Sequence, residues 1–194
     1  MLDLGTEGKH LMEIVAFDTD DRADGQGKAG ITWISKTVLN SNHVINATQK
    51  TVDGETAWTA GGWENSDMRL YLKNTIKPLI PSTVRNAIVE VNKISSTYTG
   101  GTKVSDGQTT TDDVWIPSAI EVGELSNFES KYSYPFTKTR RLKKSLSGYA
   151  RQWATRTVAT DSKIVSVKEN GDTTTIASAT SSYHYCIALG FCTN

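Results

Sequence analysis

The strongest constraint on the fold is an Asn-Gly pair that separates two short strand-like runs near the end of the chain. The runs are Ile164–Lys168 and Thr173–Ala177, and Glu169-Asn170-Gly171-Asp172 lies between them. Because Asn and Gly both tolerate the positive φ that a type I′ turn requires, this spacing predicts a β-hairpin with such a turn. We therefore expect antiparallel sheet in the C-terminal third.

The segment Tyr183–Phe191 follows this hairpin and predicts one last strand whose side chains alternate in size. On a strand, every second residue points to the same face. One face carries small side chains, which predicts that another layer approaches it closely. The large residues are Ile187, Leu189 and Phe191, and the small ones are Cys186, Ala188, Gly190 and Cys192.

Further strands are predicted earlier in the chain from short apolar or alternating runs. His10–Phe17, Ile31–Leu39 and Val114–Ile116 read as strands, and Val89–Ile94 is expected to be extended. Thr97–Asp113 is expected to be a long polar loop. Strands are therefore expected to outnumber helices.

Three helices are predicted from caps and periodicity. Ser66 can cap a helix that Pro78 and Pro81 are expected to end. Ser82 can cap a second short helix, and Ser118-Ala119-Ile120-Glu121 matches a capping box that predicts a third. The residues of the first helix that recur at three- and four-residue steps are Met68, Tyr71, Leu72, Thr75 and Ile76.

Composition and charge narrow the classes of function. The chain has 21 basic and 21 acidic residues, which argues against a nucleic-acid-binding protein. No apolar run approaches the roughly 20 residues of a membrane span, and no secretory signal is visible. Two cysteines and three histidines argue against a disulfide framework or a four-cysteine zinc site, so no metal and no cofactor is expected. We expect one α+β domain over residues 1–194, with its core at about 5–192.

Two groups of polar residues have both a functional and a structural interpretation. Cys186 and Cys192 lie about 20 Å apart if their strand is straight, so free buried thiols are expected. His184 is expected to be an exposed or satisfied side chain of that strand. The acidic segment at 18–24 does not have the spacing of an EF-hand loop, so a solvated loop is the expected state and a looser cation site the alternative.

The charge distribution has one asymmetry, because 19 consecutive residues contain seven bases and no acid. A functional interpretation is contact with an anionic surface such as phosphate, teichoic acid, acidic glycan or an acidic neighbouring subunit. The structural interpretation is a solvated strand and loop. The bases are Lys138, Arg140, Arg141, Lys143, Lys144, Arg151 and Arg156.

The five tryptophans divide into core candidates and loop candidates. Trp33 and Trp115 lie in apolar strands and are expected in the core. Trp58 and Trp63 flank a Gly-Gly pair in a loop, where they could stack on sugar rings or pack under the loop, and packing is favoured.

Several segments, taken together in order, resemble an uncharacterised domain family common in tailed bacteriophages, prophages and Gram-positive gut bacteria. The strongest are G-G-W-E-N-S-D-M-R-L-Y-L at 61–72 and A-L-G-F-C at 188–192, and others lie at 20–33, 110–118, 132–141, 152–157 and 165–171. The resemblance implies a C-type-lectin-like fold, with a small twisted, mainly antiparallel sheet, two flanking helices and long irregular loops. It also implies that the last strand pairs near the first strands.

The resemblance also assigns structural roles to two residues of Gln152-Trp153-Ala154-Thr155-Arg156-Thr157. Trp153 is expected in the core, and Arg156 is expected to bond to backbone or to a carboxylate. The Glu-Pro-Asn, Gln-Pro-Asp and Trp-Asn-Asp triplets of calcium-dependent lectins do not occur here, so calcium-mediated sugar binding is not implied.

The resemblance implies a non-enzymatic protein on the virion surface, at a tail tip, on a fibre or on the capsid exterior. Its partners would be other virion proteins or a host-surface glycan or protein, and a trimer is one possible assembly. The alternatives are a copper enzyme of the formylglycine-generating type that uses Cys186 and Cys192, or a purely structural cementing protein. The expected ligand-binding residues are Trp58, Trp63, Tyr149, Arg151, Tyr183 and Tyr185.

Overall fold

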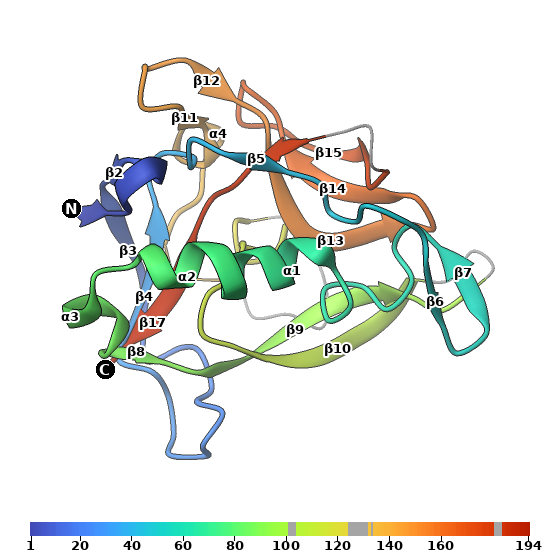
Figure 1. The fold of residues 1–194 in the computed structure, drawn as a ribbon, viewed down its shortest axis with the longest axis horizontal. Helices are drawn as coiled ribbons and strands as arrows, with labels where there is room; N and C mark the ends of the chain where they lie inside the picture. The colour runs from blue at the N-terminus through green and yellow to red at the C-terminus, as the bar shows by residue number, and fades with distance from the viewer. Residues whose placement is uncertain (101–103, 124–131, 133, 181–183) are drawn as a thin grey trace.

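Two sheets and one long hairpin carry most of the chain, as a computed structural model shows (Figure 1). Antiparallel pairing dominates and the helices are few, so the protein is a sheet-dominated α+β protein, as the sequence predicted. The structure describes residues 1–100, 104–123, 132, 134–180 and 184–194.

The larger sheet has five strands and contains the predicted Asn-Gly hairpin. Val167 pairs with Thr173 across the turn, which confirms the hairpin. The predicted type I′ turn is wrong, because within residues 168–172 only Gly171 has a positive φ (82°). Asn170 instead accepts a hydrogen bond from the N–H of Asp172 at 3.0 Å. In spatial order the strands are β15 (Thr173–Ser178), β14 (Lys163–Val167), β13 (Trp153–Thr160), β16 (Tyr185–Cys186) and β5 (Asn42–His43).

The second sheet has four strands and brings the two ends of the chain together. Met1 and Asn194 line the same shallow groove beside it, and Figure 1 shows both termini on this side. The last strand pairs next to the early strands, as the resemblance implied. In spatial order the strands are β3 (Met12–Phe17), β4 (Ile31–Ser35), β17 (Gly190–Thr193) and β8 (Ile88–Val89).

The expected single last strand is divided between the two sheets, as β16 and β17. Residues 187–189 cross from one sheet to the other, with backbone hydrogen bonds from the N–H of Leu39 to Ile187 O at 2.9 Å and from the N–H of Ser35 to Leu189 O at 2.8 Å. The predicted alternation persists, because Ile187 and Leu189 belong to one core cluster and Ala188 to the other. The segment is therefore covered on both faces.

A helical stretch of three elements lies between the sheets: α1 (Asp67–Tyr71), η2 (Leu72–Ile76, a π-helix) and α2 (Lys77–Leu79). Ser66 caps it as predicted, accepting a hydrogen bond from the N–H of Arg69 at 3.1 Å. The helix passes through Pro78, so the predicted stop at that residue is wrong, but it ends at Leu79, just before Pro81, as predicted for the second proline. Proline lacks an N–H and crowds the preceding turn, and the wider π-turn just before it makes room.

The predicted polar loop at 97–113 is largely a strand. β9 (Val91–Tyr98) and β10 (Val104–Asp112) form a long antiparallel hairpin in which Thr109 pairs with Ile94. Threonine suits a strand because its branched Cβ packs on the pleated surface. The predicted strand at 114–116 is reduced to a single bridge from Trp115 to Gly190, whose missing side chain lets the indole approach closely, as the small face of the last strand predicted.

Short elements complete the chain. The predicted helix at 118 does not form, although Ser118 and Glu121 make both hydrogen bonds of the capping box, at 2.8 and 3.1 Å. Among the described residues no helix is long and apolar enough to cross a bilayer. The remaining elements are β1 (Leu2–Asp3), η1 (Gly5–Glu7), β2 (Lys9–His10), β6 (Lys50–Val52), β7 (Glu55–Ala57), α3 (Ser82–Arg85), α4 (Lys138–Arg141), β11 (Lys143–Lys144) and β12 (Ala150–Arg151).

Gly171 is predicted to be irreplaceable in the hairpin turn. Its φ is positive, and an added Cβ would overlap the carbonyl of Lys138. Gly25 is a matched control, because its φ is +73° but nothing lies within 4 Å of its added Cβ. In urea unfolding, Gly25→Ala should cost about 1 kcal/mol from backbone strain, and Gly171→Ala should cost at least about 2 kcal/mol more from the overlap. Equal costs would contradict this packing.

Candidate functional site

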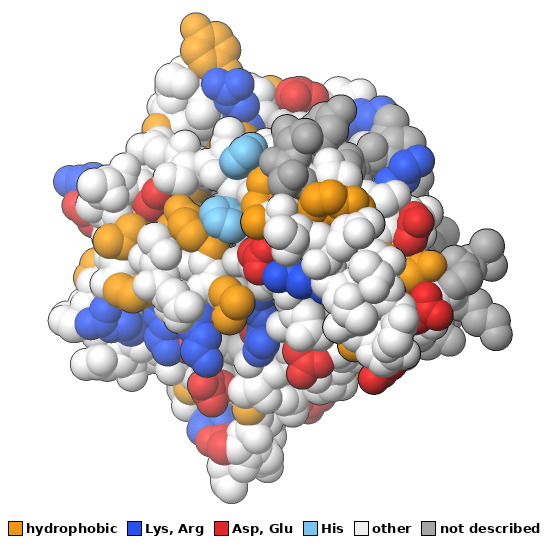
Figure 2. All heavy atoms as spheres, turned by 45° about the vertical axis from the view of Figure 1, so that its right-hand side comes forward, with side chains coloured by type: hydrophobic (Ala, Val, Ile, Leu, Met, Phe, Trp, Pro, Cys, Tyr) orange, Lys and Arg blue, Asp and Glu red, His pale blue; other side chains and the backbone are white. Residues whose placement is uncertain are grey.

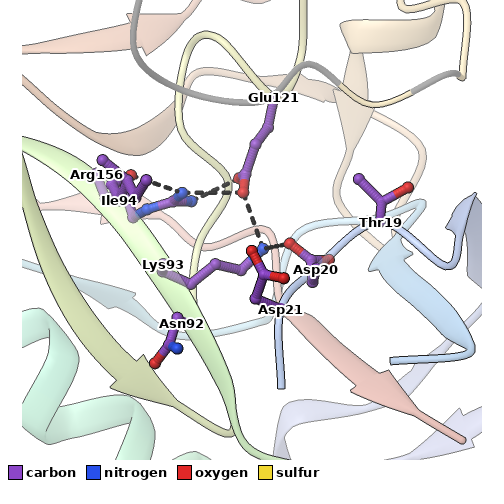
Figure 3. A pocket seen from close by; sticks show the side chains of 8 residues that line it. All are labelled: Thr19, Asp20, Asp21, Asn92, Lys93, Ile94, Glu121 and Arg156. Atoms are coloured by element: carbon purple, nitrogen blue, oxygen red, sulfur yellow. Dashed lines mark hydrogen bonds and ion pairs between the residues drawn. The ribbon is translucent and has the colours of Figure 1, made fainter. Parts of the chain in front are cut away.

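A buried cluster of charges lies where β9, β13 and two connecting segments meet (Figure 3). At its centre is the ammonium group of Lys93, which is 1% exposed. Its Nζ lies 2.5 Å from Asp20 Oδ1, 2.9 Å from Glu121 Oε1 and 2.5 Å from the hydroxyl of Tyr132. It also lies 4.1 Å from the centre of the Trp115 ring. The sequence analysis did not single out Lys93.

Arg156 extends the cluster, and its predicted partners are confirmed. Its guanidinium contacts both carboxylate oxygens of Glu121, at 2.5 and 2.9 Å. It also donates to the carbonyl oxygens of Ile116 at 3.0 Å and Ile94 at 3.2 Å, and to the Ser95 hydroxyl at 2.8 Å. Arg156 therefore bonds to both backbone and a carboxylate, as expected.

Local structure explains how each acid enters the core. The prediction of a solvated loop is wrong for Asp20, which is 8% exposed and accepts hydrogen bonds from Thr32 Oγ1 at 2.6 Å and Cys192 Sγ at 3.3 Å. Glu121 is the last residue of the capping box, and its Oε2 accepts from the N–H of Ser118. The capping box thus positions a carboxylate in the core without starting a helix.

The charges of the cluster balance and stabilise each other. Burial opposes ionisation of Glu121, but Arg156 and Lys93 outweigh it and hold the pKa of the carboxyl far below its usual range. Burial also disfavours charged Lys93, yet Glu121 and Asp20 raise its pKa. Two acids face two bases, so the cluster needs no outside counterion.

This cluster has no free hydrogen-bonding capacity for a ligand. All three N–H groups of Lys93 are used, and the N–H groups of Arg156 are directed at four acceptor residues. The adjacent hollow holds only about 50 Å³. We therefore interpret the cluster as a structural anchor. The hollow is lined by Thr19, Asp20, Asp21, Asn92, Lys93, Ile94, Glu121 and Arg156.

The two cysteines are free and buried, and they lie in different sheets. Burial raises the pKa of both thiols, and for Cys192 the neighbouring Asp20 raises it further. Raised thiol pKa values disfavour the thiolate that metal binding or nucleophilic attack requires. Among the described residues no group of three or more His, Cys, Asp or Glu side chains is arranged to hold a metal ion.

The aromatic residues expected to bind a ligand differ in how far they are exposed to solvent. Trp63 is 2% exposed and donates to Asp112 at 3.0 Å, so the favoured packing under the loop is confirmed and its role as a ligand-binding residue is wrong. Tyr185 is 6% exposed, so its predicted ligand-binding role is also wrong. Both fill the core beneath the segments that carry them. Trp58 is half-buried against the same core. Tyr183 lies outside the described residues, and Tyr149 is 68% exposed.

The residues expected to be structural are confirmed in part. Trp115 and Trp153 are fully buried. Trp33 is half-buried and packs against the first core cluster, and its Nε1 donates to Thr193 Oγ1 at 3.1 Å. The core prediction for Trp33 is therefore confirmed in part.

The predicted cationic patch is divided between surface and interior. Lys138 pairs with Asp172 at 2.6 Å, and Arg140 lies over the Tyr134 ring at 5.1 Å, both at the surface. Arg141 turns inward and donates to Gly171 O at 2.9 Å. Lys143 is 2% exposed, donates to the carbonyl of Ser35 and lies 5.5 Å from the Trp153 ring. The surface prediction is therefore wrong for Arg141 and Lys143, because both satisfy carbonyl groups inside the protein.

Two further exposed bases stand on one projecting element, the 143–151 hairpin, made of β11, β12 and their turn (Figure 1). Lys144, Tyr149 and Arg151 are exposed on it. Its base is fixed by Lys143 and by a hydrogen bond from the N–H of Val38 to Lys144 O at 3.0 Å. Figure 2 shows a hydrophobic side chain that projects at the top of the molecule, with Lys or Arg side chains directly below it.

One comparison with known proteins gives a match. Residues 34–189 match a protein family described as Domain of unknown function (DUF6273). None of the curated proteins and none of the solved structures matches the chain.

The lowered pKa of buried Lys143 should make the free energy of unfolding depend on pH. Burial lowers its pKa to about 8 in the folded protein, against the attraction of Glu13. In the unfolded chain the pKa is about 10.4, so between these values the unfolded state binds more protons. The free energy of unfolding should therefore rise with pH from 8 to about 10, by up to about 1.4 kcal/mol per pH unit, and the penalty for burying the charge should be complete below pH 8.

Urea unfolding of the wild type and of Lys143→Met across this pH range isolates the contribution of this lysine. The wild-type free energy minus that of the variant should rise with pH. A difference that stays flat would contradict a buried lysine that loses its proton in the folded state.

Proposed function

This chain belongs to the family described as Domain of unknown function (DUF6273), and we propose that it is a non-enzymatic attachment domain that holds an anionic partner with the 143–151 hairpin. The observation that carries the proposal is the contrast between this hairpin and the core. The hairpin presents Lys144, Tyr149 and Arg151 to solvent, whereas Lys93 and Arg156 are neutralised by buried acids. A partner can therefore engage charge at the hairpin without breaking the core.

The division between rigid sheet and exposed turn supports binding rather than catalysis. Binding residues commonly lie on loops that a rigid scaffold positions. The alternative copper enzyme has weaker support, because Cys186 and Cys192 lie in different sheets and their burial disfavours the thiolate. A purely structural cementing role would use the same hairpin against an acidic neighbouring subunit.

The setting we propose is the surface of a phage particle, where the domain recognises a host envelope or anchors a neighbouring virion protein. The sequence resemblance supports this setting. The mainly antiparallel sheets, the adjoining chain ends and the pairing of β17 with β4 are compatible with the C-type-lectin-like fold that the resemblance implies. That fold assignment is part of the proposal.

Cosedimentation of the purified domain with Gram-positive cell envelopes tests the attachment role. The double variant Lys144→Glu/Arg151→Glu should lose most of the bound fraction because it reverses the charge of the hairpin, and raising the salt concentration should weaken wild-type binding. Lys73→Glu is the matched control, since Lys73 is an exposed lysine on the helical stretch. An equal loss in Lys73→Glu, or no effect in the double variant, would contradict the role of the hairpin.

A further inference from the structure

Tyr149 and Arg151 share one face of the hairpin. Lys143 pairs with Arg151 and Lys144 with Ala150, and the N–H of Ser145 continues the ladder to Tyr149 O at 2.8 Å. Residues two apart on a strand point to the same side, about 7 Å apart along it. Lys144 therefore lies on the opposite face from the ring of Tyr149 and the guanidinium of Arg151.

The ring of Tyr149 is held out by a braced turn. The N–H of Gly148 donates to Ser145 O at 2.9 Å. Leu146 lies against the backbone at Gly8, where an added side chain would overlap it. Tyr149 is the most exposed aromatic residue among those the structure describes. Because the turn is already ordered, a ligand that stacks on this ring incurs little further loss of conformational entropy.

Arg151 lies close to the start of the larger sheet, where the next residue on its side of the strand, Trp153, is buried. Trp153 pairs with Cys186 in parallel, and Arg151 and His184 each lie two residues before that pair. The register therefore places them at the same end of neighbouring strands, and His184 is exposed. The charge of Arg151 opposes the burial-driven rise in the pKa of Cys186, which fits a guanidinium close to β16.

We infer, on the premise of the attachment role proposed above, that the partner is an anionic glycan. Its sugar ring stacks on Tyr149 while an acid group of the same or the next sugar pairs with Arg151, and His184 adds a hydrogen bond. The C–H face of a sugar packs on an aromatic ring, and a guanidinium binds carboxylate, sulfate or phosphate through two parallel hydrogen bonds. An acidic protein would require only the positive charge of Arg151 for binding. It would give the exposed ring of Tyr149 no role.

Isothermal titration of the whole domain with four polymers tests this inference. The polymers are dextran, dextran sulfate of the same length, hyaluronate and polyglutamate. Dextran sulfate and hyaluronate should bind, dextran should not, and polyglutamate should bind at least about tenfold more weakly than dextran sulfate. Tyr149→Ala and Arg151→Ala should each weaken glycan binding about tenfold, the value of one good contact. Lys73→Ala, which removes the same charge from an exposed lysine of the helical stretch, should change it less than about threefold.

Three outcomes would overturn the inference, and they separate it from the attachment role. If polyglutamate binds as tightly as dextran sulfate and Tyr149→Ala has no effect, the glycan is excluded and anion attachment stands. If Lys73→Ala weakens binding as much as Arg151→Ala, binding does not depend on the hairpin face. If none of the anionic polymers binds, both the glycan and the anionic partner are excluded. Circular dichroism of each variant verifies that the hairpin substitutions leave the fold intact.

Discussion

The ion pairs between Lys93 and its two carboxylates join parts of the chain that lie far apart in the sequence. Asp20 comes from the segment after β3, Lys93 from β9, Glu121 from a turn and Arg156 from β13. Removing charges from water costs several kcal/mol per ion, and only complete pairing offsets that cost. Each segment must therefore occupy its place for the others to be stable, and the register of the β9–β10 hairpin against β13 depends on this condition.

This constraint also decides where binding can occur. A sequence with seven bases and no acid over 19 residues suggests a continuous cationic surface, yet Arg141, Lys143 and Arg156 are directed at carbonyl and carboxylate groups inside the protein. Lys138 is exposed but paired with Asp172, whereas Lys144 and Arg151 stand on a short hairpin next to an exposed tyrosine. The interior bases fix the scaffold, and the bases of the hairpin are left for a partner.

The sequence was sufficient for features that depend on neighbouring residues. The Asn-Gly hairpin, the Ser66 cap and the alternation at 186–189 all follow from local spacing, whereas the buried Trp153 was implied by the family resemblance. Features set by distant packing could not be predicted in this way. The choice of Asp112 as the partner of Trp63 and the inward turn of Asp20 towards Cys192 each depend on segments far away in the sequence. One sequence signal for the burial of Lys93 was present but ambiguous. Lys93 lies two residues from both Val91 and Ser95 on β9, so it shares their buried face.

The unfolding free energy of Lys93→Met tests most directly whether the buried charges organise this fold. The substitution removes one ammonium group and leaves Asp20 and Glu121 less well paired in the core. The account predicts a loss of about 3–5 kcal/mol in urea unfolding, together with faster amide exchange in the segment around Asp20. Lys138→Met removes an exposed ion pair and should leave the unfolding midpoint close to that of the wild type. A loss within about 1 kcal/mol for Lys93→Met, with unchanged exchange around Asp20, would contradict the account.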